Sequence, residues 1–181
     1  MRSTKLVSLL IVLCAVAVGL GCSEKQKAPD ISGDVRNALN QVGLNDVSVS
    51  QDRDKGVVTL KGEVGTQDDK TRAESIAKSI AGGEVISNEI GVRPNGNEST
   101  AKKVDSDLDS AIDKNLSAAL TEHHMKSDVN YDVKNGVVTL KGDVPSQTER
   151  STVEKLAQQV PNVKQVVNEI EVKHQKATST K

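Results

Sequence analysis

Residues 56–64 read GVVTLKGEV, and residues 136–144 repeat them as GVVTLKGDV. The offset of eighty positions holds without a gap as far as the tripeptide Asn-Glu-Ile, which occurs at 88–90 and again at 168–170. Self-similarity at a fixed offset is the sequence signature of a duplicated structural unit. The chain is therefore expected to contain two copies of one small domain.

The segments outside the two copies are polar or targeting sequence. Residues 94–100 read PNGNEST, which are turn formers and polar residues typical of a linker. We expect this linker to let the second domain reorient as the freer of the two units. The expected organisation is a lipoprotein signal peptide at 1–21, a tether at 22–29, a first domain at 30–93, a linker at 94–104, a second domain at 105–174 and a disordered tail at 175–181.

Hydrophobic periodicity gives the same order of elements in each copy, helix, strand, strand, helix and strand. Asn135-Gly136 is a strong two-residue hairpin signal. Ser146 precedes Glu149 with the spacing of a helix capping box. The predicted fold class is α+β: two tandem α-β-β-α-β two-layer sandwiches, each with two helices on one face of a three-stranded mixed sheet. Gly62 and Gly142 are expected to let a helix approach the sheet closely.

These motifs resemble the BON domain family, named for bacterial osmotically inducible and nodulation proteins. The resemblance is carried by the order α-β-β-α-β, by the GVVTLKGxV strand and by the closing VxNxIxV strand at 166–172. It covers both copies. A lipid-anchored chain with two such domains is similar to dual-BON lipoproteins of the Gram-negative outer membrane. The resemblance implies a role in envelope integrity or stress tolerance, binding to phospholipid surfaces, and no catalysis.

The N-terminus is typical of a bacterial lipoprotein signal, with basic residues, the apolar run Leu6–Leu20 and then Gly21-Cys22. Fifteen helical residues span roughly 22 Å, which is short of a hydrocarbon core of about 30 Å, so a spanning anchor is the weaker alternative. An ordinary or disulfide-bonded Cys22 is the other alternative, and Cys14 would be its one partner. We expect Cys22 to carry acyl chains such as palmitate and to hold the chain on the membrane, facing the periplasm. By analogy, Ser23 after that cysteine favours the outer membrane.

Composition excludes several classes of function. The chain has 181 residues, a net charge of −1, one Tyr and neither Phe nor Trp, so stacking platforms and a basic footprint for nucleic acid are absent. Adjacent helical residues point about 100° apart, so His123 and His124 are not spaced as paired metal ligands. No serine lies in a motif that places a His and a carboxylate around it. We therefore expect no nucleic-acid binding, no metal, no cofactor and no enzymatic activity.

Two non-enzymatic hypotheses are left open. In the first, the domains contact phospholipid head groups, with anionic lipids favoured by basic side chains. In the second, an exposed sheet edge docks on another envelope protein. The candidate membrane or partner contacts are Lys55, Lys61, Lys134, Lys141, His123, His124, Met125 and Lys126. A solvated strand face or a polar helix end is the structural alternative for each of them.

Overall fold

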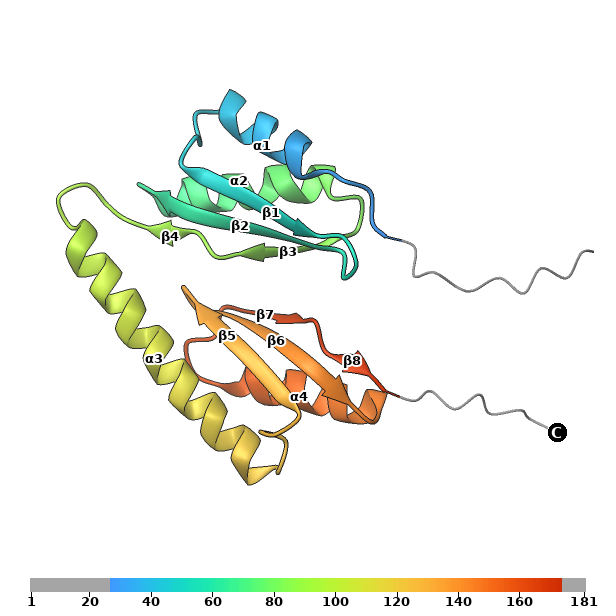
Figure 1. The fold of residues 1–181 in the computed structure, drawn as a ribbon. Helices are drawn as coiled ribbons and strands as arrows, with labels where there is room; N and C mark the ends of the chain where they lie inside the picture. The colour runs from blue at the N-terminus through green and yellow to red at the C-terminus, as the bar shows by residue number, and fades with distance from the viewer. Residues whose placement is uncertain (1–26, 174–181) are drawn as a thin grey trace, which may run out of the picture.

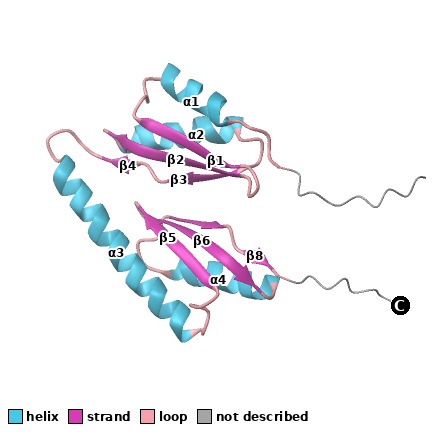
Figure 2. Ribbon diagram, viewed as in Figure 1, coloured by secondary structure: helices cyan, strands magenta, loops and turns pink. Residues whose placement is uncertain are grey.

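The computed structural model describes residues 27–173, which form two domains of the same architecture. The first domain consists of α1 (Ser32–Gln41), β1 (Val47–Asp52), β2 (Val57–Val64), α2 (Gln67–Ile80), β3 (Val85–Asn88) and β4 (Gly91–Val92). The second consists of α3 (Glu98–Glu122), β5 (Val129–Lys134), β6 (Val137–Val144), α4 (Gln147–Gln159), β7 (Gln165–Asn168) and β8 (Glu171–Val172). The predicted pair of α-β-β-α-β units is confirmed (Figure 2). The expected signal peptide at 1–21, Cys22 and the expected tail at 175–181 lie outside the described residues.

Each sheet is mixed, as the chain order requires. β1 pairs antiparallel with β2, and β2 pairs parallel with both β3 and β4, which are the two halves of the predicted last strand. The second sheet repeats this pairing with β5, β6, β7 and β8. In both domains the two helices cover one face of the sheet, and the apolar cores lie between these layers (Figure 1).

Local signals in the sequence act as expected. Asn135 and Gly136 have φ angles of 49° and 81°, the left-handed pair that a tight hairpin needs. The Ser146 hydroxyl accepts a 3.2 Å hydrogen bond from the Glu149 amide, and Thr66 accepts the matching bond from Asp69 at 3.1 Å. These bonds satisfy backbone donors in the first turns of α4 and α2.

The two strand glycines have a different role from the one expected. A Cβ on Gly62 would lie 2.1 Å from the carbonyl oxygen of Asp46, and one on Gly142 would lie 2.3 Å from that of Asp128. Their φ angles are +125° and +124°. The close neighbour is therefore the backbone that enters the adjacent strand, and the expectation that a helix approaches these glycines was wrong.

The expected linker is largely helical. α3 begins at Glu98, so residues 98–104 form its first turns rather than a flexible connection. After Gly96 the chain has neither Gly nor Pro until Gly136, so nothing interrupts a helix once it has started. The Glu98 carboxylate also accepts a 2.9 Å hydrogen bond from the Gly96 amide. α3 runs along the side of both domains (Figure 1).

The two sheets turn their uncovered faces toward each other, so that the helices lie on the outside (Figure 1). None of the helices within residues 27–173 has the length and apolar character needed to cross a bilayer. The second domain is docked on the first in this arrangement, whereas the sequence favoured a freely reorienting unit.

Candidate functional site

The two domains meet through an interface that follows their internal repeat. Its apolar part is Val57, Val137 and Val167, which form a buried cluster separate from both domain cores. Val57 and Val137 occupy equivalent positions, eighty residues apart. The contact therefore has approximate two-fold character, as in a symmetric dimer whose halves present the same surface.

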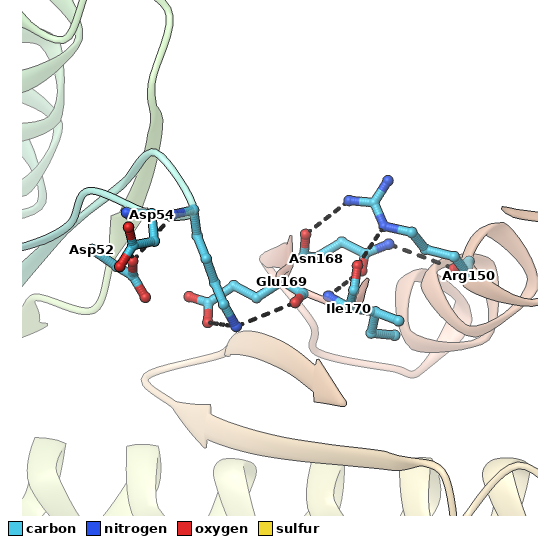
Figure 3. A network of polar contacts seen from close by, with 7 residues as sticks. Asp52, Asp54, Arg150, Asn168, Glu169 and Ile170 are labelled. Carbon is cyan, nitrogen blue, oxygen red and sulfur yellow. Dashed lines mark hydrogen bonds and ion pairs between the residues drawn. The ribbon is translucent and has the colours of Figure 1, made fainter. Parts of the chain in front are cut away.

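Two equivalent hairpin turns extend this symmetry. The side-chain amide of Asn135 in the second domain donates a 2.7 Å hydrogen bond to the main-chain carbonyl of Glu89 in the first domain. Lys55, the equivalent residue of the first domain, donates to the carbonyl of Glu169 at 3.4 Å and pairs with its carboxylate at 3.5 Å. Figure 3 shows Glu169 beside the turn that carries Asp52 and Asp54. Each hairpin thus contacts the short irregular segment that separates the last two strands of the other domain.

Gln165 adds a contact that has no counterpart. Its side chain accepts a 3.2 Å hydrogen bond from the main-chain amide of Asn88 and donates a 2.6 Å bond to the main-chain carbonyl of Ile86. These are the groups that β3 directs away from β2, so Gln165 covers the edge of the first sheet. The equivalent residue of the first domain is Val85, which cannot return the contact and is 46% exposed.

Arg93 ties α3 to the first domain. Its guanidinium, only 8% exposed, pairs with Asp105 of α3 at 2.5 Å and with Glu63 of β2 at 3.3 Å. It also donates to the Val92 carbonyl at 3.0 Å. A buried charge is stable only when it is paired and hydrogen-bonded. The network therefore places the first half of α3 beside the first domain.

The repeated Asn-Glu-Ile is structural within each domain. Asn88 donates a 2.9 Å hydrogen bond to Glu74 of α2, and its side-chain oxygen accepts one from the Ile90 amide at 3.3 Å. Asn168 repeats both contacts, with Glu154 at 2.8 Å and the Ile170 amide at 3.2 Å. Arg150 holds the same break through the carbonyls of Asn168 and Ile170 (Figure 3).

These contacts shift two ionisation equilibria. Burial, followed by repulsion from Lys164 of the second domain, lowers the pKa of Lys70, whose ammonium donates a 2.7 Å bond to the Ile90 carbonyl. Burial acts to raise the pKa of Glu74, but hydrogen bonds from Lys78 and Asn88 outweigh it and hold that pKa below its ordinary value. The lowered pKa of Glu74 means that its contacts stabilise the segment between β3 and β4, whereas the lowered pKa of Lys70 reflects the cost of burying its ammonium there.

A cleft of about 710 Å³ lies where α3, β5 and the first domain meet. Its walls alternate in charge, so it is a polar groove rather than an apolar pocket. The lining side chains include Lys61, Glu63, Glu89, Arg93, Lys102, Asp105, Asp109, Asp113, Lys114, Tyr131, Asp132 and Lys134. Asp109 accepts two 2.8 Å bonds from the amides of Asn135 and Gly136, which fixes the hairpin against α3.

The predicted contact residues are divided between the interface and the surface. Lys55 takes part in the domain contact, with 29% of its side chain exposed. Lys61 is more exposed but lies 3.5 Å from the Glu89 carboxylate. Lys134 and Lys141 are exposed on β5 and β6, and neither forms an ion pair within residues 27–173. The structure therefore does not bring the four strand lysines together in one patch.

The predicted helix-end residues follow α3 directly. His123, His124 and Lys126 are exposed, and Lys126 donates a hydrogen bond to the Ser117 hydroxyl. Met125 is half-buried against the second core. This end of α3 lies far from the first domain (Figure 1). Across the described part of the chain, no three His, Cys, Asp or Glu side chains are placed to share a metal ion.

Sequence reasoning missed the residues that join the domains, chiefly Glu89, Arg93 and Gln165. One signal was present. Val57 and Val137 are apolar residues on a strand face that is otherwise occupied by Thr59, Lys61 and Glu63 or their equivalents. An apolar residue at the same place on both polar faces is typical of a covered patch.

Comparison with known proteins gives one family and several relatives. The family described as the BON domain matches the chain twice, over residues 27–94 and 105–174. An uncharacterized protein in the gshII 5' region of Anaplasma centrale is 35% identical, with 67% of this chain and 80% of that protein covered. Osmotically-inducible protein Y of Escherichia coli (strain K12) is 28% identical, with 79% and 71% covered. Among solved structures, the C-terminal domain of CdsD, a structural protein of the type III secretion system of Chlamydia trachomatis, is 13% identical with a TM-score of 0.33, covering 81% of this chain and 99% of that chain.

Proposed function

Because this chain belongs to the BON domain family, we propose that it is a periplasmic protein of the cell envelope that binds phospholipid surfaces with its second domain. Its similarity to a protein named for osmotic induction supports a role in envelope integrity under stress. The proposed function is binding to a membrane surface, without catalysis.

Attachment of the chain to the membrane is assigned to Cys22. A lipid on this residue would be followed by a tether that is shorter than the sequence indicated. The Ala28 amide donates a 2.8 Å bond to the Arg53 carbonyl, and the Pro29 carbonyl accepts a 2.7 Å bond from Gln51. Residues 28 and 29 are therefore held on the first hairpin. From Cys22 to Ala28 the chain reaches at most about 21 Å, which would keep the first domain close to the bilayer.

The exposed end of α3 is the observation that carries the lipid-binding proposal. His123, His124 and Lys126 are exposed there, at the end of the second domain that is remote from the first. Lys141 is a further exposed ammonium of the second domain; it lies opposite Asn130 in the sheet, on the face of β6 that also carries Val137. Each basic group near an anionic surface contributes about 1 kcal/mol of attraction. Lys55 and Lys61 are less available, because Glu169 and Glu89 pair with them.

Vesicle flotation tests this proposal. The form spanning residues 23–181 is mixed with phosphatidylcholine vesicles that contain or lack phosphatidylglycerol, at low and at high salt. We expect flotation with anionic vesicles at low salt and its loss at high salt. The double variant Lys126→Glu, Lys141→Glu should lose flotation, while the control Lys103→Glu, Lys155→Glu, with the same change in net charge at exposed sites, keeps most of it.

Two outcomes would overturn the proposal. One is no flotation of the wild-type form at low salt, which favours docking on another envelope protein instead. The other is an equal loss in the test and control variants, since that result would mean that overall charge rather than this end of the domain determines binding.

A further inference from the structure

The sequence contains two Asn-Gly pairs, Asn95-Gly96 in the connection between the domains and Asn135-Gly136 in the hairpin between β5 and β6. Asparagine is a chemically labile residue. The main-chain nitrogen of the next residue attacks the side-chain carbonyl carbon, and glycine opposes this attack least because it has no Cβ and adopts many conformations. The two pairs share one chemistry, so their surroundings determine which of them reacts.

The first pair lies in an exposed turn. Asn95 and Gly96 are both exposed, and a 3.0 Å hydrogen bond from the Asn97 amide to the Pro94 carbonyl closes the turn around them. Within the described part of the chain, no hydrogen bond holds the side chain of Asn95. The Gly96 amide donates to the Glu98 carboxylate at 2.9 Å, but this contact is at the surface, where water competes for both groups. The Asn95 side chain is therefore free to turn its carbonyl carbon toward the Gly96 nitrogen.

The second pair is buried and held in place. Asn135 is 6% exposed, and Gly136 is buried beside it. The Asn135 side chain donates to the Glu89 carbonyl of the first domain, and the Asp109 carboxylate accepts from both main-chain amides of the pair. Attack by the Gly136 nitrogen requires loss of its bond to Asp109 and rotation of the Asn135 side chain away from Glu89. Because bonds to a charged acceptor are strong, the reaction requires a prior local opening of the hairpin.

We propose that Asn95 is a site of spontaneous deamidation in the folded protein, and that the bonds to Asp109 and Glu89 protect Asn135 from the same reaction. Hydroxide removes the proton of the Gly96 amide, and this nitrogen forms a bond to the side-chain carbonyl carbon of Asn95. The bond from that carbon to the amide nitrogen breaks, and the nitrogen takes a proton from water and leaves as ammonia, which restores the hydroxide. Water then opens the resulting succinimide at either carbonyl and gives aspartate or isoaspartate at position 95.

Isoaspartate at position 95 changes the connection between the domains. The main chain then runs through the former side chain, which adds one methylene group to the turn and leaves a new carboxylate on it. The bond from the Asn97 amide to the Pro94 carbonyl closes a ring of fixed size, so the longer chain disrupts this bond. The turn joins Arg93 to α3, whose Asp105 pairs with Arg93. The modification therefore acts on the segment that holds α3 beside the first domain, and it does not involve the exposed helix end proposed to contact lipid.

The test incubates the form spanning residues 23–181 at mildly alkaline pH and follows each asparagine by peptide mapping with tandem mass spectrometry. Deamidation is detected by the mass difference between an amide and a carboxylic acid. We expect Asn95 to convert at least about tenfold faster than Asn135 in the folded protein. In the urea-unfolded chain the two should convert at similar rates, because the bonds that hold the hairpin are absent. Asn97, which is exposed but precedes Glu98, should stay intact while Asn95 converts.

A pair of variants tests the protection of the hairpin. Asp109→Ala removes the acceptor of both main-chain amides and should speed conversion of Asn135 by about fivefold or more. Asp107→Ala, at an exposed site on the same helix, should leave that rate within about twofold. An unchanged rate in Asp109→Ala would overturn the protection.

The comparison of folded and unfolded wild-type protein depends on no variant. Equal rates at Asn95 and Asn135 in the folded protein would overturn the proposal. So would an Asn95 that stays intact in the folded protein while the unfolded chain converts. Conversion of Asn97 as fast as that of Asn95 would also overturn it, because exposure alone would then explain the reaction.

Discussion

The side-chain amide of Asn135 donates a 2.7 Å hydrogen bond to the main-chain carbonyl of Glu89, across the boundary between the two domains. Lys55 makes the equivalent contact with Glu169 in the opposite direction. One chain thus contains an interface of the kind that a homodimer forms, with equivalent turns binding equivalent strand breaks. The linking helix α3 and the single Gln165 contact make the two halves unequal.

The buried valines should be needed for docking of the domains. Val57→Asp places a carboxylate at a position that is 4% exposed, in an apolar cluster without a partner for it. We expect the domains to separate while each keeps its own fold. The form spanning residues 23–181 has no cysteine, so spin labels at Ser50→Cys and Asn130→Cys can report the distance between β1 and β5. The label distance should become longer and broader, whereas Ser48→Asp, an exposed change, leaves it unaltered. A narrow, unchanged distance in Val57→Asp would contradict the interface.

Gln165 should protect a specific amide of the first domain. Gln165→Val installs the residue found at the equivalent position 85 and removes the acceptor for the Asn88 amide. Hydrogen exchange of that amide should accelerate by about tenfold or more, because its one direct acceptor is lost. Gln159→Ala, an exposed change on α4, serves as the control. If the Asn88 amide stays as protected as in the wild type, the edge contact does not persist in solution.

Gly62 and Gly142 should contribute equally to the stability of their domains. Alanine at Gly62 or Gly142 brings a Cβ against a carbonyl oxygen and requires a positive φ, so each change should cost about 3 kcal/mol or more. Gly33→Ala, in a helix with open space around it, should instead add about 0.5 kcal/mol.

Two probes separate the domains in this experiment. Tyr131 is the single aromatic residue, so its fluorescence reports the second domain and circular dichroism reports both. Gly142→Ala should shift the fluorescence transition in urea more than Gly62→Ala does. Tolerance of either alanine without loss of stability would mean that the close approach of the strands is not maintained.

Asp109 should stabilise the second hairpin through its two hydrogen bonds. Asp109→Ala leaves the amides of Asn135 and Gly136 without their charged acceptor, and the expected cost is about 2 kcal/mol of unfolding free energy. Asp107→Ala, which removes an equal charge from an exposed site on the same helix, should change stability by about 0.5 kcal/mol or less. Urea denaturation followed by Tyr131 fluorescence measures both. Equal effects of the two changes would assign the result to helix charge instead of the hairpin.

Glu74 should make the fold sensitive to acid. Its pKa is held below the ordinary value in the folded chain, so the carboxylate contributes stability above the unfolded pKa of about 4.3 and loses it as the pH falls through the folded value. Glu74→Gln removes this titration. Between about pH 6 and about pH 3 the variant should therefore lose less unfolding free energy than the wild type. Parallel pH profiles of the two proteins would contradict the assignment.

The amino-acid sequence by itself determined the duplicated fold. The repeat of residues 56–64, the Asn135-Gly136 turn and the Ser146 cap act through the chain within a few residues, so their effects could be predicted from local pattern. Buried strand positions followed from alternation in the same way. The helical start at Glu98 was missed, because polar composition indicated a linker and the helix is held by the contact of Asp105 with Arg93 of the first domain.

Only the tertiary structure determined how the two domains pack against each other. Glu89, Gln165 and Val57 become interface residues because the uncovered sheet faces meet, and no local pattern specifies which surface of one domain lies on the other. The same packing pairs Lys55 with Glu169 of the other domain. Local periodicity fixes which side of a strand is apolar, but contacts between residues eighty positions apart depend on how whole domains dock.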